Sequence, residues 1–295
     1  MKSVALLLSA FCLLTCAKHD PVVVGSKNFT ESVILGELLA QKLESARCSV
    51  DRRLNMGGSL VCDAAIAAGS LDAYVEYSGT ALTAILHQPA TTDRAAVDRN
   101  VAAAYAKRGL RWGPNLGFNN TFAMIVRRDY ARQHALRTIS DLRKVQHEVR
   151  PGFGYEFVER PDGWPGLVAR YHLDVATPPK TMDLGLTYKA LAAGEIDLIA
   201  GNSTDGLIDS LGLVILADDL HYFPPYDAAV VARNDIDRKC GGASAALAAL
   251  ANTIDDAAMR RLNYEVDGKK RDVAEVVREL LDAQRRTTGR RPSSR

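Results

Sequence analysis

From Pro21 onward, short runs of β-branched residues alternate with longer segments whose apolar residues recur every three to four positions. This alternation predicts an α/β fold with largely parallel sheets. The expected strands are 22–25, 50–54 and 71–75, and the expected helices are 30–43 and 59–68. Asn28, followed three residues later by Glu31, is expected to cap the first helix. That helix would begin at the sheet edge where open α/β folds bind ligands.

A weak internal repeat organises the middle of the chain. Residues 65–72 (AIAAGSLD) resemble residues 190–197 (ALAAGEID), and both segments read as a helix end, a glycine and a buried strand. We expect two similar lobes. The alternative is that the likeness reflects only the way any α/β unit ends.

Two strand-like segments bracket the second repeat copy and predict how the lobes are connected. Residues 122–129 and 226–235 each begin with an aromatic residue, continue as a buried strand and end in charged residues. We expect the chain to cross into a second lobe and later return. The first lobe would then contain 16–125 plus 228–284, the second lobe 126–227, and the two crossing strands would form a hinge.

The C-terminal part is expected to be helical and to end in a tail. Segments 241–252, 255–266 and 271–286 carry apolar residues at helical spacing, which predicts helices that face the core. The last eleven residues, 285–295, hold five arginines and no apolar residue, so a solvated, disordered tail is expected.

Composition and charge exclude several classes of protein. Of 295 residues, 47% are hydrophobic and 24% are charged, which is typical of globular domains. The 37 Lys and Arg residues nearly balance 35 Asp and Glu, so no field of the chain as a whole would recruit nucleic acid.

The N-terminus carries the pattern of an export signal. Lys2 precedes an apolar run, 4–14, that is shorter than the roughly 20 residues needed to span a bilayer. Residues 1–15 are therefore expected to be a signal peptide. The sequence Leu13-Leu14-Thr15-Cys16 resembles a bacterial lipobox, although Thr15 replaces the usual small residue. Cys16 is the expected lipid anchor; simple cleavage nearby is the alternative, and either leaves the protein exported.

The remaining cysteines and histidines favour no metal site. Cys48 and Cys62 are a candidate disulfide if the fold brings them together, and buried free thiols are the alternative. The other cysteine, Cys240, lies far from both in sequence. No spacing typical of zinc ligands occurs, so we expect neither a metal nor a cofactor.

Six motifs in consistent order resemble one family of proteins. They are Gly25-Ser-Lys-Asn-Phe-Thr-Glu31, Gly57-Gly58-Ser59, Asp72-x-x-x-Glu76-Tyr77-Ser-Gly-Thr80, Gly117-Phe-Asn-Asn-Thr-Phe122, Ser203-Thr-Asp-Gly206 and Asp218-Asp-x-x-Tyr-Phe-Pro-Pro-Tyr226. Together they look like the substrate-binding proteins of osmoprotectant ABC importers, the receptors for glycine betaine, choline and carnitine. The resemblance covers nearly all of residues 22–285. It implies a two-lobed periplasmic-binding-protein fold of type II with a ligand in the cleft.

The resemblance also implies which residues bind. In this family, tyrosine rings surround the ligand's trimethylammonium group, each contact contributing roughly 0.5–2 kcal/mol. Tyr77 and Tyr226 match two of these tyrosines. Phe122 stands where a third is usual and Asn202 where a fourth is usual, so the cage has one wall fewer unless Tyr155 or Trp164 replaces it.

Two further matches concern the ligand's other end. Lys27 and Thr80 match the positions that hold it in the family, and a lysine near a helix N-terminus suits a carboxylate. This favours betaine-like zwitterions over choline. The resemblance implies ABC permease subunits as partners and a monomeric receptor.

Other readings of the same residues lead to other functions. The tyrosines could pack the lobes, Lys27 could pair with Glu31, and Asn202 could cap a helix. An enzyme is disfavoured because the chain has no Gly-x-Ser-x-Gly, phosphate loop or paired nucleophile and base. A receptor for another amine or amino-acid-like ligand, or one that serves a sensor, is the alternative that the missing tyrosine supports.

Overall fold

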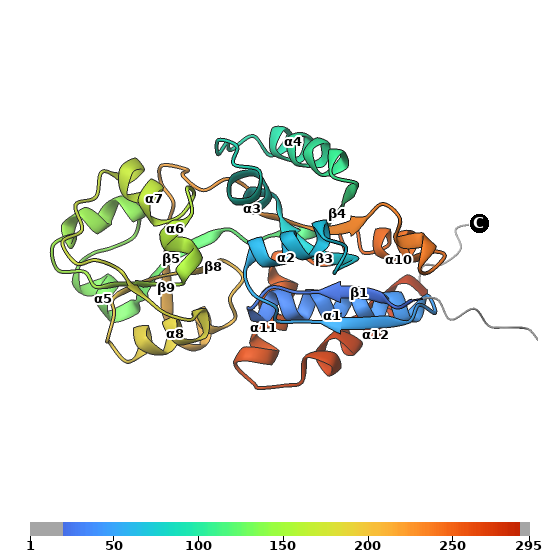
Figure 1. Cartoon of the computed structure of the whole chain (residues 1–295). Coiled ribbons are helices and arrows are strands. Elements are labelled where there is room, and N and C mark those ends of the chain that lie inside the picture. Colours follow the sequence, from blue (N-terminus) through green and yellow to red (C-terminus); the bar gives the residue numbers. More distant parts are fainter. Residues whose placement is uncertain (1–19, 290–295) are drawn as a thin grey trace, which may run out of the picture.

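Two five-stranded sheets form the centres of two lobes, as the computed structural model shows for residues 20–289 (Figure 1). The expected signal peptide, 1–15, and the proposed anchor Cys16 lie outside the described residues. The α/β prediction and the two-lobed fold are confirmed.

The first sheet has the order β2-β1-β3-β10-β4. Its strands are β1 (Val22–Gly25), β2 (Val50–Arg53), β3 (Ala73–Tyr77), β4 (Leu110–Asn119) and β10 (Asp227–Arg233). Strands β1, β2 and β3 are parallel, whereas β10 runs antiparallel to β3 and β4. The sheet therefore accepts one strand from the segment that returns from the second lobe.

The second sheet repeats this arrangement with the order β7-β6-β8-β5-β9. Its strands are β5 (Phe122–Arg127), β6 (Pro151–Phe153), β7 (Lys180–Thr181), β8 (Leu198–Asn202) and β9 (Leu213–Leu216). Strands β6, β7 and β8 are parallel, and β5 runs antiparallel to β8 and β9. Strands β3 and β8, which follow the two repeat copies, thus occupy equivalent places.

The aspartates that end the repeat copies have equivalent roles. The Asp72 carboxylate accepts a hydrogen bond from the Val23 backbone N–H at 2.7 Å, and Asp197 accepts one from the Arg150 N–H at 3.2 Å. Each aspartate is buried and is also paired with a basic side chain, Lys239 or Arg150. This shared use of a buried carboxylate supports a real structural repeat.

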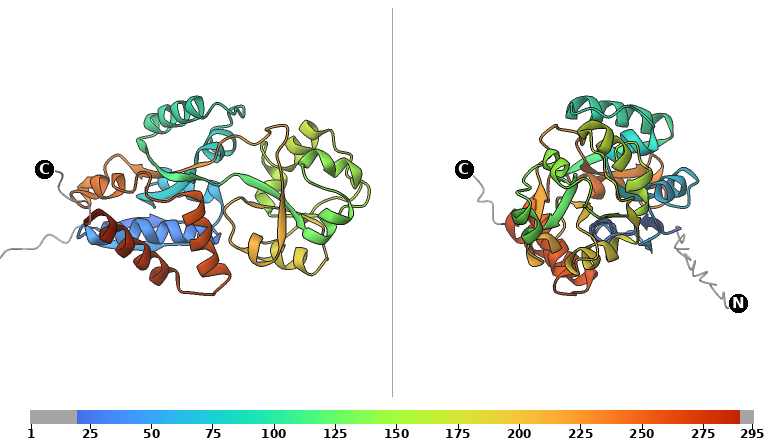
Figure 2. Two further views of the ribbon diagram at one scale, coloured as in Figure 1. Left: turned by 180° about the vertical axis from the view of Figure 1, so that it is seen from behind. Right: turned by 90° about the vertical axis from the view of Figure 1, so that its left-hand side faces the viewer.

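The chain crosses between the lobes at two places, one after β4 and one before β10 (Figure 2). Strand β5 lies entirely in the second sheet, so the first crossing falls at 120–121 and not at the expected boundary of 125 and 126. The reason is that Phe122 already pairs with Asn202 of β8. Strand β10 lies in the first sheet, so the connections, rather than two long strands, link the lobes.

Helices cover both faces of each sheet. In the first lobe they are α1 (Thr30–Ser45), α2 (Ser59–Ala67), α3 (Ser78–Thr80), the π-helix η1 (Ala81–Ile85), α4 (Arg94–Lys107), η3 (Ile236–Arg238), α10 (Ala243–Ala248), α11 (Asp256–Asp267) and α12 (Val273–Gly289). In the second lobe they are α5 (Arg128–Gln133), η2 (Ile139–Lys144), α6 (Tyr155–Glu159), α7 (Trp164–Tyr171), α8 (Leu184–Ala192) and α9 (Leu207–Ser210). Helix α1 lies between the first sheet and the C-terminal helices α11 and α12 (Figure 1).

Two details of the helices differ from the sequence prediction. The residue that caps α1 is Phe29, and no side chain bonds there, so Asn28 and Glu31 form no capping box. Glu31 is instead buried, and other side chains donate hydrogen bonds to its carboxylate. Helix α12 continues to Gly289, into the segment 285–295 for which a solvated tail was expected; the rest of that segment lies outside the described residues.

A disulfide joins Cys48 to Cys240, with the two Cα atoms 5.5 Å apart. The candidate pair of Cys48 and Cys62 is therefore wrong. Cys48 packs in the hydrophobic core on the α1 side of the sheet, whereas Cys62, a buried free thiol, packs with Ile66 and Tyr74 in a separate core. The return of the chain after the second lobe brings Cys240 to Cys48 across 192 residues of sequence.

Candidate ligand-binding site

A cavity of about 920 Å³ lies between the lobes, at the carboxyl ends of the parallel strands. All six residues predicted to bind the ligand line it. Lys27, Tyr77 and Thr80 come from the first lobe, Phe122 and Asn202 from the second, and Tyr226 from the connection that returns before β10. Residues widely separated in sequence are thus brought to one cavity.

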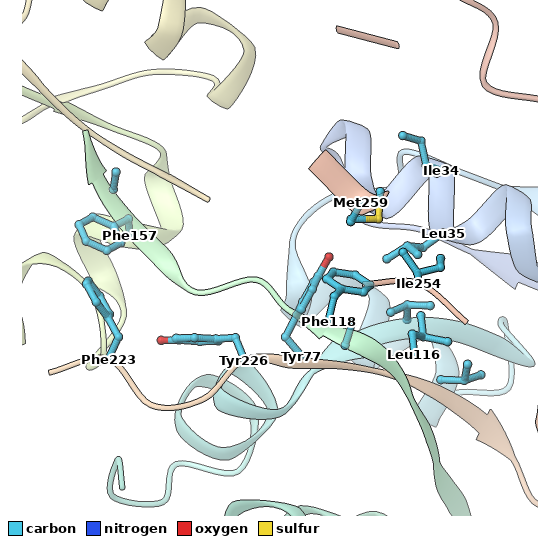
Figure 3. Packing of buried hydrophobic residues seen from close by; sticks show 14 of the residues in the cluster. Ile34, Leu35, Tyr77, Leu116, Phe118, Phe157, Phe223, Tyr226, Ile254 and Met259 are labelled. Carbon is cyan, nitrogen blue, oxygen red and sulfur yellow. The ribbon is translucent and has the colours of Figure 1, made fainter. Parts of the chain in front are cut away.

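Tyr77 and Tyr226 are held side by side by sheet pairing. Tyr77 ends β3, and β10 pairs with β3 so that Ala228 lies opposite Tyr77. The Tyr226 ring lies against Gly79, where an added Cβ would come within 2.7 Å of ring carbons. Figure 3 shows both rings near the crossing segments. The glycine of the Tyr77-Ser-Gly motif therefore makes room for the second ring.

Further rings extend this group into the second lobe. Phe122 lies edge-on to Tyr226, with ring centroids 5.4 Å apart, and 4.9 Å from Phe157 of α6. Phe157 was not predicted; it lines the cavity but follows no motif that would have marked it. Two residues are candidates to replace the missing fourth ring. Tyr155 lines the cavity, whereas Trp164 packs in the core of the second lobe, with its ring centroid 4.8 Å from that of Phe153.

Lys27 forms a buried ion pair with Glu76. Its Nζ lies 2.6 Å from Glu76 Oε1, and both side chains are at most 4% exposed. The same Nζ lies 4.3 Å from the centroid of the Tyr77 ring. The alternative that Lys27 is a surface cation paired with Glu31 is therefore wrong. An ammonium group thus lines the cavity, with its charge balanced by Glu76.

Arg160 is a cavity residue that sequence reasoning missed. Its guanidinium pairs with Asp162 at 2.6 Å, donates to the Thr80 hydroxyl at 3.1 Å and lies 5.1 Å from the Phe122 ring centroid. Asp162 in turn accepts from the Tyr226 hydroxyl at 2.6 Å. Among the described residues no hydrogen bond uses Arg160 Nη1. The residue follows α6 in a turn, and nothing in the local sequence distinguishes it from an exposed arginine.

The sequence of this chain matches a family of known proteins. Residues 20–283 match the family of substrate binding domains of ABC-type glycine betaine transport systems. The chain belongs to this family.

Individual relatives agree with that assignment. The ergothioneine transport permease/ergothioneine binding protein EgtU of Helicobacter pylori (strain G27) is 33% identical over 282 residues, which cover 94% of this chain and 50% of the relative. The chain thus spans half the length of that protein. The carnitine transport binding protein OpuCC of Listeria monocytogenes serotype 1/2a (strain 10403S) is 32% identical over 295 residues, covering 95% of this chain and 94% of the relative.

A solved structure supports the fold. A glycine betaine/carnitine/choline ABC transporter protein superimposes with a TM-score of 0.73 at 31% identity, covering 90% of this chain and 98% of the other. The protein is a solute-binding receptor of an ABC importer and not an enzyme, as expected, and such receptors act outside the cytoplasm. Within residues 20–289 no helix is long and apolar enough to cross a membrane.

The receptor's cavity contains tyrosines that stay protonated. Burial and the nearby Glu31 carboxylate hold the pKa of Tyr77 well above its usual value, and burial and Asp162 do the same for Tyr226. Their hydroxyls therefore donate to those carboxylates. Asp162 is buried, which raises its pKa, but the hydrogen bonds and charge of Arg160 outweigh burial and lower it.

Asn202 stands beside a carboxyl group. The Asp205 carboxylate accepts hydrogen bonds from the Asn202 backbone N–H at 2.9 Å and from the Tyr188 hydroxyl. Burial raises the pKa of Asp205 to about 6. Where the resemblance leads one to expect a tyrosine, the cavity therefore presents an amide next to a carboxyl group.

One of several contacts between the lobes involves the start of α2. The Ser59 backbone N–H, at the start of α2, donates to Glu156 Oε1 of α6 at 2.9 Å. A Cβ on Gly58 would lie 1.8 Å from that oxygen, so a larger residue there would displace the Glu156 carboxylate. The Gly57-Gly58-Ser59 motif thus leaves room for a carboxylate from the opposite lobe. The part of the chain described holds no cluster of side chains suited to a metal ion.

Proposed function

We propose that this receptor binds a betaine-like quaternary ammonium zwitterion between its lobes and delivers it to the permease subunits of an ABC importer. The observation that carries the proposal is the convergence of Tyr77, Phe122 and Tyr226 on one cavity that also presents Lys27 and Arg160. Rings attract a poorly hydrated cation, and the basic side chains attract a carboxylate.

The two ends of such a ligand are recognised differently. The trimethylammonium group lies among the ring faces. The carboxylate lies near Thr80, where the Nη1 group of Arg160 supplies a donor. Because Arg160 belongs to the second lobe and Thr80 to the first, a ligand that occupies this position draws the lobes together about the two crossing connections.

Calorimetry on the purified receptor tests the proposal. Glycine betaine, carnitine and proline betaine are expected to bind, and choline, which has no carboxylate, is expected to bind more weakly. Tyr77→Ala and Tyr226→Ala should each weaken binding roughly threefold to thirtyfold, the value of one ring contact. Tyr264→Ala is the matched control, because that ring is partly exposed and outside the cavity. Heat from primary amino acids alone would refute the proposal.

A second ligand class is favoured by one observation. Asn202 and Asp205 offer a hydrogen-bond donor and an acceptor where a ring is usual, which suits a zwitterion with a polar side chain. The Helicobacter pylori relative is named for ergothioneine. Ergothioneine therefore belongs in the same titrations; binding much tighter than that of glycine betaine would establish this alternative. A role in feeding a sensor would leave the binding site unchanged.

We also propose that Cys16 carries a lipid that tethers a monomeric receptor to the membrane. The lipobox-like Leu13-Leu14-Thr15-Cys16 supports this. Cys16→Ser should move the protein from the membrane fraction to the soluble fraction. An unchanged distribution would refute the anchor without affecting the ligand proposal.

A further inference from the structure

Glu31 is a buried carboxylate on the first turn of α1, 1% exposed. Its Oε1 accepts from the Tyr77 hydroxyl at 2.6 Å and from Asn120 Nδ2 at 2.7 Å. Its Oε2 accepts from the Thr204 hydroxyl and from Asn263 Nδ2 at 3.0 Å. These donors come from both lobes and from the crossing segment, so the carboxylate is fully enclosed by protein.

The charge on this carboxylate has no cation beside it. Glu76 and Asp162, two other buried carboxylates near the cavity rings, are paired with Lys27 and Arg160. No salt bridge among residues 20–289 includes Glu31, and its partners are neutral donors. Four donors together suit an ionised carboxylate, since only the anion accepts from all of them. Burial raises the pKa of Glu31, while the hydrogen bonds from Thr204 and the others oppose that shift.

Tyr77 connects this charge to the cavity. Its ring lines the cavity, and its hydroxyl donates to Glu31. A phenol that donates to an anion is polarised toward its ring, and the ring face then attracts a cation more strongly. A neutral group of the same shape gains nothing from this polarisation.

We propose that Glu31 is a specificity-determining positioning residue, which acts through the Tyr77 hydroxyl to make the cavity select a quaternary ammonium over a neutral group of equal size. The inference rests on the proposed function, since it concerns the same site. Glu31 itself touches no ligand; it orients and polarises the Tyr77 ring, which does.

A pair of isosteric ligands tests this. Glycine betaine and tert-butylacetate share shape and carboxylate, and differ in carrying a charged nitrogen or a neutral carbon. The ratio of their dissociation constants measures selection for charge. Tyr77→Phe keeps the ring but removes the link to Glu31, and Glu31→Gln keeps the shape but removes the charge. Each should reduce the ratio roughly threefold to tenfold by weakening betaine alone.

Tyr171→Phe is the matched control. The Tyr171 hydroxyl also donates to a carboxylate, that of Asp218, but the residue lies outside the cavity lining. In this variant the ratio of the dissociation constants of the two ligands should equal that of the wild type. If Glu31→Gln fails to fold, because four donors no longer meet two acceptor oxygens, Tyr77→Phe decides the question alone.

The outcomes separate the two proposals. If the wild type binds betaine and both ligands weaken equally in the variants, Glu31 is only structural and this inference is overturned while the proposed function stands. If the wild type does not bind betaine, the proposed function fails and the inference with it.

Discussion

The two walls of the cavity are each built around a buried ion pair, one in each lobe. Lys27 pairs with Glu76 in the first lobe, and Arg160 pairs with Asp162 in the second. Each basic group also faces an aromatic ring of its own wall. Because the two charges within each pair cancel, the net charge of the site depends on other carboxyl groups.

Those other carboxyl groups distinguish the walls. Glu31 accepts from Tyr77, whose ring faces the cavity, whereas Asp205 accepts from Tyr188 and the Asn202 backbone. Tyr188 packs in a core of the second lobe, and it lines the cavity as well. Each wall thus joins a carboxyl group to a cavity-lining tyrosine, but Glu31 accepts hydrogen bonds from four side chains and Asp205 from one side chain and one backbone N–H. We expect the first wall to recognise the cation, and the second to supply the guanidinium of Arg160 and a contact that joins the lobes.

The largest expected effect comes from breaking an ion pair. Lys27→Met leaves Glu76 buried without its counter-charge, which should lower the free energy of unfolding by about 3–5 kcal/mol. Urea denaturation measures this. Lys27→Met combined with Glu76→Gln should recover most of the loss. Arg160→Met should lower the free energy of unfolding by a similar amount, since its ion pair is nearly as buried. If the two losses differ markedly, the two ion pairs contribute unequally to stability.

A smaller effect concerns Asp205 and pH. Its folded-state pKa, about 6, exceeds the usual 3.8, because burial and the charges of Glu31 and Asp267 outweigh the hydrogen bonds from Tyr188 and Asn202. The folded state therefore binds more protons between these values, so stability is lost as pH rises through about 6. Asp205→Asn should remove this loss and stabilise the protein at pH 7 by about 1–3 kcal/mol, allowing for the partial solvation of this cavity-lining side chain.

Urea unfolding at several pH values between 4 and 7 checks this prediction. Asp209→Asn, an exposed change on the neighbouring helix α9, is the control. Equal pH dependence in the wild type and in Asp205→Asn would contradict the assignment of this charge to the second wall.

The smallest effect is expected at the contact of Glu156 with Ser59, one of several between the lobes. Glu156→Gln keeps an acceptor for the Ser59 N–H but removes its charge, a loss of about 0.5–1.5 kcal/mol, so ligand affinity should fall roughly twofold to tenfold. Glu159→Gln, on the same helix but exposed, should leave affinity unchanged in calorimetry. Equal affinities in both variants would mean that the contact adds nothing to closure.

Local patterns were sufficient for much of the fold. The strand 22–25 and the starts of the helices at 30 and 59 agree with β1, α1 and α2, because β-branched runs and helical periodicity are local signals. Helix α10 is shorter than the predicted 241–252, and β3 begins at Ala73 rather than Leu71. Such ends depend on partners: Asp72, for example, turns its carboxylate to the Val23 N–H.

The site residues divide in the same way. Five of the six predicted residues lie in the quoted motifs, Asn202 directly precedes one, and all six line the cavity. Arg160 and Phe157 carry none, and the role of Glu31 was misread because its spacing from Asn28 imitates a capping box. Their partners lie tens to hundreds of residues away, as with Thr80 for Arg160 and Asn263 for Glu31.

By itself the sequence determined the alternating α/β elements, the repeat and the aromatic and basic residues of the site, since these depend on composition and short-range periodicity. Tertiary structure alone decided the Cys48–Cys240 disulfide, the crossing at 120–121 and the enclosure of Glu31. Each of these depends on which distant segments the return of the chain brings together. The partners of a buried charge come from segments that are distant in sequence, so no local pattern predicts them.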